Sequence, residues 1–188
     1  VNIPERKLYY FDSGKLLMSH IISVGNPSTQ WQTPIGDYKI KEKVKNPVWS
    51  VPPSIQREMK QRGQTVITEV PAGPGNPLGK WFLSLGGGIG IHSTNAPSTV
   101  GYFVSHGCIR LRPKSAEQVF NAVKKDTPVK IIYQPVKLNV DDKDNIFLVV
   151  YSDIFYKKVN IRSQVEKIIK DYHFENNVPP TILIYFHM

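Results

Sequence analysis

The chain has 188 residues, of which 40% are hydrophobic and 21% are charged. That is enough for one well-filled core, or one core with a small annex, in an ordinary globular protein. No apolar run approaches the ~18 residues of a transmembrane helix. The single cysteine excludes an internal disulfide, so the cysteine count does not fix the compartment. Fifteen prolines and thirteen glycines favour turns and short strands over a helix bundle.

The formal net charge is +9, which indicates either a solvated basic surface or an anionic partner. Such a partner is a nucleic acid, a membrane face or an acidic polymer such as bacterial cell wall. The sequence has no RNA-binding signature and no zinc-finger spacing, so charge alone gives little support to nucleic acid.

The N-terminal part of the chain reads as strands. Residues 7–11 and 16–24 flank the turn signal Asp12-Ser13-Gly14 and predict a hairpin. A second turn at 33–36 leads into a strand at 38–40.

A long irregular stretch follows at residues 43–80, interrupted by prolines and glycines, with a short helix expected at 54–61. Such a loop in a compact domain is typical of a lid or binding loop. Trp49 and Trp81 at its ends are candidates for a substrate groove, but core positions are favoured for both.

Residues 81–85 and 89–92 predict strands, joined by Gly86-Gly87-Gly88. No Gly-Lys-Ser/Thr follows the glycines, so they indicate a turn and not a phosphate loop.

The clearest helix spans 115–125, with Ser115 as its cap and Gln118 completing a capping box, and a strand is expected at 129–133. Beyond residue 135 the pattern changes to a βαβ-like annex: strand 146–151, helix 161–172 and strand 181–186. We therefore expect a main domain at 1–135 and a small α+β extension of unknown role at 136–188.

The candidate catalytic residues lie between residues 91 and 111. Cys108 follows His106 and Gly107, and His92 lies sixteen residues upstream of Cys108. Only a thiolate is a good nucleophile, and a free cysteine has a pKa near ~8.5. An imidazole held in one tautomer by a carbonyl can take the thiol proton and pass it to a leaving amine. We therefore predict acyl transfer, with Cys108 attacking and His92 as the base.

Two neighbouring residues suit the same reaction. Gly107 permits unusual dihedrals and close approach of a substrate, and amides around Gly107 and Cys108 are suited to an oxyanion. Arg110 offers a planar fork for a substrate carboxylate.

Taken singly, these residues have structural interpretations. A lone cysteine is usually a small buried hydrophobe, a lone histidine a satisfied polar group, and a lone arginine a surface charge. One thiol with two widely spaced imidazoles makes a poor zinc site, so we predict neither a metal nor a cofactor.

The segment resembles the signature of the L,D-transpeptidases of the YkuD family, also called the ErfK/YbiS/YcfS/YnhG family. That signature places a histidine a dozen or more residues before Ser/Thr-His-Gly-Cys, an apolar residue and Asn or Arg. Here His92 precedes Ser105-His106-Gly107-Cys108-Ile109-Arg110 with twelve residues between. The resemblance covers about residues 1–135. Further matching segments are Thr33–Gly36, Lys45–Trp49, Val70–Pro74, Asn76–Gly79 and Thr127–Ile131.

The resemblance implies a mainly β fold of mixed sheets with a helix packed near the nucleophile. It implies that Cys108 is the nucleophile and that His92 accepts and donates the proton, held by the Ser93 carbonyl. The other matching positions are His106, which lines the site and supports the oxyanion or substrate, Arg110, which binds substrate, and Ser105, which shapes the turn.

The implied substrate is a peptidoglycan stem peptide, attacked at the meso-diaminopimelate carbonyl with loss of D-alanine. Transfer to an amine gives a 3-3 cross-link or an anchored lipoprotein, whereas transfer to water makes an L,D-carboxypeptidase. The chain opens without Met, and we expect a protein exported to the periplasm or wall whose signal segment is absent here.

Two rivals remain: a non-catalytic wall-binding module, and a cysteine peptidase or amidase acting on other peptides. We expect an active site to be alkylated quickly at Cys108 at mildly acidic pH, or acylated by a carbapenem. An inert buried thiol favours the binding module.

Overall fold

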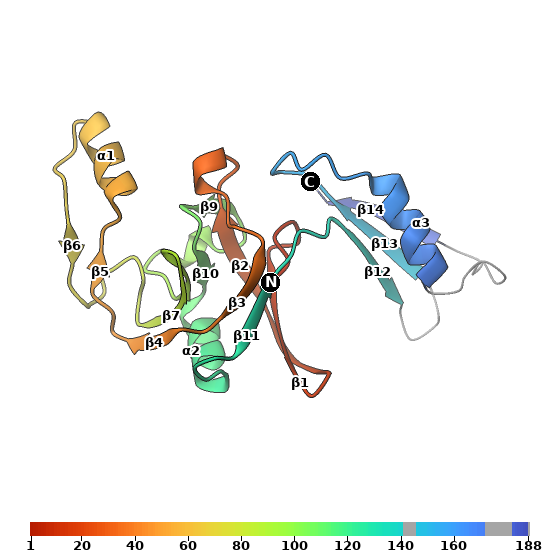
Figure 1. Cartoon of the computed structure of the whole chain (residues 1–188), viewed down its shortest axis with the longest axis horizontal. Helices are drawn as coiled ribbons and strands as arrows, with labels where there is room; N and C mark the ends of the chain where they lie inside the picture. The colour runs from red at the N-terminus through yellow and green to blue at the C-terminus, as the bar shows by residue number, and fades with distance from the viewer. Residues whose placement is uncertain (141–145, 172–181, 188) are drawn as a thin grey trace. The chain divides into compact units, whose positions relative to one another are not determined.

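The computed structural model describes residues 1–140, 146–171 and 182–187 (Figure 1). It divides into two compact units. The larger contains Val1 and Arg6–Ile131, and the smaller contains Asn2–Glu5 and the chain from Ile132 onward. The larger unit ends at Ile131, and residues 2–5 belong to the smaller unit.

The larger unit is built on a mixed sheet with the strand order β1-β2-β10-β8-β7-β4, and β9 pairs with β2. The strands are β1 (Lys7–Asp12), β2 (Lys15–Gly25), β4 (Glu42–Lys45), β7 (Trp81–Gly86), β8 (Ile89–His92), β9 (Phe103–Ser105) and β10 (Ile109–Leu111). The pairs β10–β8 and β2–β9 are parallel, and the other neighbours are antiparallel. The predicted mainly β fold with mixed sheets is confirmed.

Two small sheets and the helices complete this unit. The sheets are β3 (Gly36–Lys39) with β11 (Pro128–Ile131), and β5 (Trp49–Ser50) with β6 (Glu69–Val70). The helices are α1 (Pro53–Gln61) and α2 (Pro113–Ala122), with 3-10 turns η1 (Thr29–Trp31) and η2 (Pro97–Thr99). The Phe120 ring of α2 lies 4.8 Å from the ring of Trp81 on β7. Trp81 is 8% exposed, which confirms its predicted core position.

Buried side chains alternate along the central strands, so the main sheet has one face that packs against the core and an opposite, second face. Leu83, Ile91, Ile109 and Leu111 are all at most 2% exposed and pack inward. Successive residues on a strand point to opposite faces, so their sequence neighbours point the other way.

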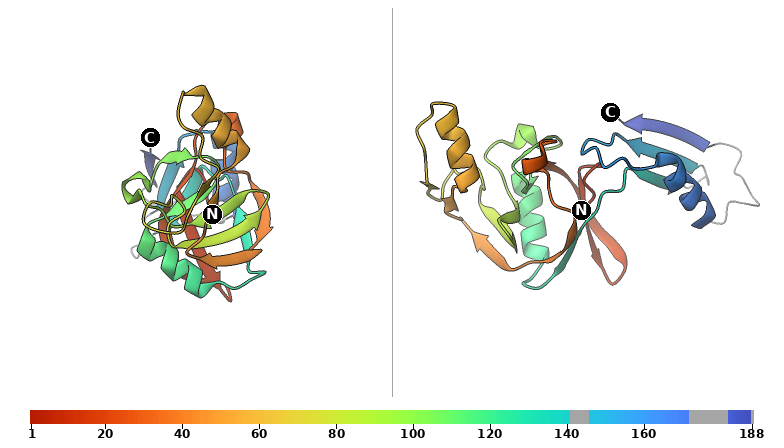
Figure 2. Two further views of the ribbon diagram at one scale, coloured as in Figure 1. Left: turned by 90° about the vertical axis from the view of Figure 1, so that its left-hand side faces the viewer. Right: turned by 45° about the horizontal axis from the view of Figure 1, so that its top comes forward.

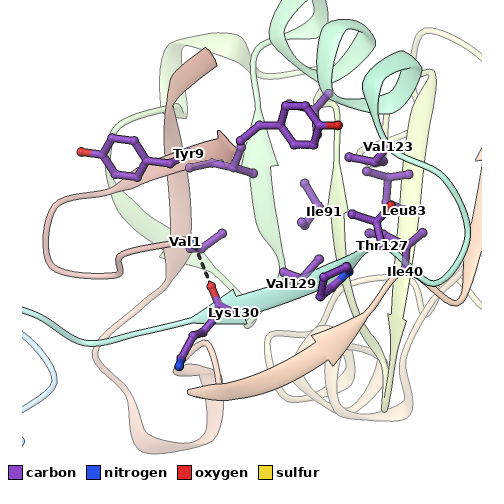
Figure 3. Close-up of a pocket in the computed structure, with 13 residues that line it drawn as sticks. Val1, Tyr9, Ile40, Leu83, Ile91, Val123, Thr127, Val129 and Lys130 are labelled. Atoms are coloured by element: carbon purple, nitrogen blue, oxygen red, sulfur yellow. Dashed lines mark hydrogen bonds between the residues drawn. The ribbon is translucent and has the colours of Figure 1, made fainter. Parts of the chain in front are cut away.

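Figure 3 shows an apolar pocket on the core side of this sheet, beside β11 and the C-terminal end of α2. Ile91, Leu83 and Val123 line it, together with Val129 and Thr127. Because Ile91 points into it, the adjacent His92 points to the opposite face. The pocket is a gap in the core and belongs to no site on that second face.

The structure corrects several local predictions. Helix α2 begins at Pro113 and ends at Ala122, and its N-cap is Arg112 without a side-chain cap bond, so the capping box at Ser115 is wrong. Proline suits the first helical position because its fixed φ is already helical and its missing N–H is not needed there.

The turn between β7 and β8 is confirmed, since Gly87 and Gly88 take φ values of +60° and +77°. Residues 33–35 are irregular and Gly36 already belongs to β3, so no turn forms there. The short strands β9 and β10 were not predicted.

The smaller unit contains a three-stranded sheet of order β12-β13-β14, with β13 and β14 parallel. Its elements are β12 (Val136–Val140), β13 (Ile146–Tyr151), α3 (Ile161–Asp171) and β14 (Ile182–His187). Val136, Leu148 and Val150 form its core, against which Ile161 and Val165 of α3 pack. Figure 2 shows α3 lying along one face of this sheet. The predicted βαβ order is confirmed; the predicted ends at residues 172 and 181 lie outside the described residues.

Candidate active site

The parallel ladder between β8 and β10 brings the separated motif residues onto one face. Ile109 pairs with Ile91, and Arg110 pairs with His92. Residues in register on neighbouring strands share a face, and so do residues two apart on one strand. Arg110 and His92 therefore face the same side of the sheet, away from the core, and Cys108 lies one residue before β10 begins.

His92 is 3% exposed, and its Nδ1–H donates to the Ser93 carbonyl at 2.5 Å. Burial, and then the Arg110 charge, lower the pKa of His92 to about 4, against backbone hydrogen bonds to Ser93 and Leu78 that raise it. At neutral pH the ring is therefore neutral. With Nδ1 carrying the proton, Nε2 has the free lone pair, as a general base requires.

Cys108 is partly exposed, and its thiol donates to the Gly88 carbonyl at 3.8 Å. Burial raises the pKa of Cys108, while a backbone hydrogen bond from Gly90 and the Arg110 charge lower it. Burial is the largest of these effects, so the resting Cys108 is a neutral thiol, as the His92 ring is a neutral imidazole. A neutral resting thiol disfavours fast alkylation at mildly acidic pH, and that expectation stays a prediction.

Two hydroxyls hold the turn that precedes Cys108. Ser105 Oγ accepts the Gly107 N–H at 3.1 Å and donates to the Cys108 carbonyl at 2.5 Å. Thr33 Oγ1 accepts the Gly25 N–H at 2.8 Å and donates to the Gly107 carbonyl at 2.9 Å. Gly107 takes φ +106°, which a residue with a side chain rarely adopts. The Gly107 amide that the sequence offered to an oxyanion is therefore already bonded to Ser105.

His106 lies on the same turn, held from two directions. Its Nε2 is 3.0 Å from Glu58 Oε2 on α1, and its ring meets the Trp31 ring edge-on at a centroid distance of 4.3 Å. Its side chain is 31% exposed, so a ligand has access to it.

Arg110 is half-buried, and burial lowers its pKa against the opposing effect of Cys108. Its Nε atom is buried without a hydrogen-bond partner among the described residues. A buried charged donor without a partner costs stability, and a carboxylate satisfies it well. Arg110 is thus equipped to take an anionic group at this face.

Sequence reasoning missed Thr33, Glu58, Leu78 and the carbonyl of Gly88. Thr33 lies within one of the matching segments, and Gly88 lies in the predicted turn, but neither pattern indicates the bond of Thr33 to Gly107 or the contact of Gly88 with Cys108. The described residues contain no cluster of three or more His, Cys, Asp or Glu side chains able to hold a metal ion. None of the helices described here is both long and apolar enough to cross a lipid bilayer.

Residues 1–131 match the family model of the YkuD L,D-transpeptidase catalytic domain. The chain belongs to the YkuD family. It is 33% identical over 164 residues to the probable L,D-transpeptidase ErfK/SrfK of Salmonella typhimurium, covering 87% of this chain and 53% of that protein. The chain thus spans about half the length of this curated relative.

Solved structures share the fold of this YkuD chain. A crystal structure of the Enterococcus faecium L,D-transpeptidase C442S mutant aligns with a TM-score of 0.55 and 22% identity, over 70% of this chain and 48% of that one. An L,D-transpeptidase in complex with imipenem aligns with a TM-score of 0.51 and 23% identity, over 70% of this chain and 56% of that one.

Proposed function

We propose that this YkuD chain is a cysteine-dependent L,D-transpeptidase of peptidoglycan. Cys108 attacks the meso-diaminopimelate carbonyl of a tetrapeptide stem, D-alanine leaves, and the acyl group passes to an amine. The observation that supports the proposal is the β8–β10 register, which pairs Arg110 with His92 two residues after Cys108, together with the action of the Arg110 charge on the pKa of both His92 and Cys108. Membership of the family supports the reaction class.

The first half-reaction uses the neutral thiol and imidazole. His92 Nε2 takes the Cys108 proton as sulfur bonds to the carbonyl carbon, and the Ser93 carbonyl stabilises the imidazolium through Nδ1–H. The tetrahedral intermediate collapses as the C–N bond breaks, and His92 returns the proton to the departing D-alanine amine. A thioester on Cys108 remains.

The second half-reaction reverses these roles. The acceptor amine bonds to the thioester carbon and its proton passes to His92. The C–S bond then breaks, and His92 returns this proton to the departing sulfur, which restores the Cys108 thiol. Arg110, with its unpartnered Nε, binds a substrate carboxylate. His106 contacts the substrate, and Ser105 keeps the turn in shape. The chemistry needs neither a cofactor nor a metal.

The acceptor is a second stem peptide, which gives a 3-3 cross-link, or the amine of an anchored lipoprotein. Water in its place makes the enzyme an L,D-carboxypeptidase. The matching location is the periplasm or cell wall, where the stems are found, and the net charge of +9 suits a carboxylate-rich polymer.

Mass spectrometry of purified tetrapeptide stems incubated with the protein and an amine acceptor tests this function. Loss of D-alanine with a new amide supports transpeptidation, and loss without a new amide supports carboxypeptidase activity. Binding without any bond cleavage favours the wall-binding module, and cleavage of unrelated peptides favours the peptidase. The Cys108→Ser variant is the control and must release no D-alanine.

A further inference from the structure

The arm formed by residues 46–80 leaves the main sheet after β4 and returns at β7. Its two ends are joined by a hydrogen bond from the Asn46 amide to the Lys80 carbonyl at 2.8 Å. Asn76 is fully buried and its Nδ2 donates to the carbonyls of Pro47, Val70 and Pro71. The base of the arm is therefore a fixed platform.

This platform is packed directly against the candidate site. A Cβ on Gly79 would lie 2.7 Å from the Cβ of Ser93, whose carbonyl holds His92. At the far end of the arm, α1 has no fully buried residue, and Figure 1 shows it at one extremity of the larger unit. Packing alone therefore holds α1 weakly.

Glu58 links α1 to the turn that carries the nucleophile. Its Oε2 accepts from His106 Nε2 at 3.0 Å, and its Oε1 pairs with Arg62 at 2.5 Å. The carboxylate is 24% exposed, so it is partly shielded from water. Because a carboxylate accepts the Nε2 proton, Nδ1 of His106 is the ring atom left for a ligand.

Trp31 completes the support of this ring. It approaches His106 edge-on from η1, with an interplanar angle of 76°. The ring is thus restrained by a carboxylate on one element and an aromatic side chain on another. A ring held in one tautomer and one orientation needs no reordering when substrate arrives.

From these contacts we propose that Glu58 is a positioning residue, which fixes the His106 ring and couples the arm of residues 46–80 to the reaction at Cys108. The inference rests on the proposed function, because it assigns Glu58 a part in turnover. The contact between Glu58 and His106 could either position the His106 ring or only anchor α1, and the two roles have different consequences. A partly exposed pair that only anchors α1 contributes at most about 1 kcal/mol to stability and leaves turnover unchanged.

The test compares Glu58→Ala and Glu58→Gln with Arg57→Gln, an exposed substitution on the same helix. D-alanine release gives kcat and KM, and 15N NMR of the imidazole nitrogens gives the His106 tautomer without depending on activity. We expect Glu58→Ala to lower kcat about 10-fold with KM within about 2-fold, and to abolish the preference for the Nε2–H tautomer. Glu58→Gln keeps an acceptor oxygen, so its kcat should lie between those of Glu58→Ala and wild type.

The inference is overturned if both Glu58 variants turn over within about 2-fold of Arg57→Gln. An unchanged His106 tautomer in Glu58→Ala overturns it equally. If wild type releases no D-alanine, the proposed function fails, and the nitrogen spectra alone then decide whether Glu58 positions the ring.

Discussion

Arg110 of β10 lies in register with His92 of β8, and its charge lowers the pKa of both His92 and Cys108. Burial acts with this charge on the imidazole and against it on the thiol. The result is a resting pair in which both groups are neutral. In the proposed reaction, proton transfer from Cys108 to His92 is therefore part of the chemical step, and four predictions follow from this proposal and from the packing around the site.

The first prediction concerns the pH dependence of stability. The pKa of His92 is about 4 in the folded chain and 6.5 ordinarily. The unfolded chain therefore takes up this proton at higher pH, so the stability contribution is complete above about pH 6.5 and is lost as the pH falls toward 4. A shift of this size corresponds to about 3 kcal/mol.

Urea unfolding at several pH values between 4 and 7 measures this loss. The His92→Gln variant lacks the titrating ring and should lose less stability over the same interval. Equal losses in wild type and variant would show that His92 is not buried in its neutral form.

The second prediction concerns the reactivity of Cys108. Because burial raises its pKa, the rate of alkylation by iodoacetamide should still be rising above pH 8. Replacing Arg110 with Met removes a charge that lowers this pKa, so alkylation at fixed pH should slow further. Arg112→Met, on an exposed residue nearby, is the matched control and should behave as wild type. A plateau in the wild-type rate below pH 7 would contradict the neutral resting pair.

A third prediction follows from the contact between Gly79 and Ser93. Gly79 takes φ +62°, and an added Cβ would meet the Cβ of Ser93 at 2.7 Å. Gly63 takes the similar φ of +67° with open space around it. Gly63→Ala should therefore cost only the backbone strain of about 1–2 kcal/mol.

Gly79→Ala should cost more, by about 1–3 kcal/mol for the overpacking, and should also slow D-alanine release because the Ser93 carbonyl is displaced from His92. Urea unfolding and turnover of the two variants measure both effects. Equal stability and equal turnover of Gly79→Ala and Gly63→Ala would show that the base of the arm accommodates the added Cβ without disturbing His92.

The fourth prediction concerns Thr33. Its hydroxyl bridges the Gly25 amide and the Gly107 carbonyl and is 1% exposed, so Thr33→Val leaves two buried backbone groups without this partner. We expect a loss of about 1–3 kcal/mol in unfolding free energy per unsatisfied group. We also expect slower turnover, because the turn before Cys108 loosens. Thr99→Val, whose hydroxyl caps a partly buried 3-10 turn, is the control and should retain turnover.

Local signals in the sequence were enough to predict the hairpin β1–β2, the glycine turn between β7 and β8, and the βαβ order of the smaller unit. Each of these depends on periodicity or turn residues within a few positions. The start of α2 was misread because Ser115 and Gln118 fit a capping box, whereas Pro113 two residues earlier begins the helix. Three-residue strands such as β10 are too short to show alternation.

The candidate residues of the site could be named from the motif, but their arrangement could not. The pairing of Arg110 with His92 is a parallel contact between distant segments, and no local pattern specifies its register. Glu58 was missed for the same reason, because its contact with His106 spans 48 positions of sequence. The raised pKa of Cys108 depends on burial in the folded chain, which no local sequence pattern specifies.

The most direct test of the account is intact-protein mass spectrometry after rapid mixing with a tetrapeptide stem or with imipenem, followed by peptide mapping. The account predicts one acyl adduct, located on Cys108, absent in Cys108→Ser and formed at least about 100-fold more slowly in His92→Gln. An adduct on another residue, or formation at the wild-type rate without His92, would contradict the pairing of this thiol with this imidazole.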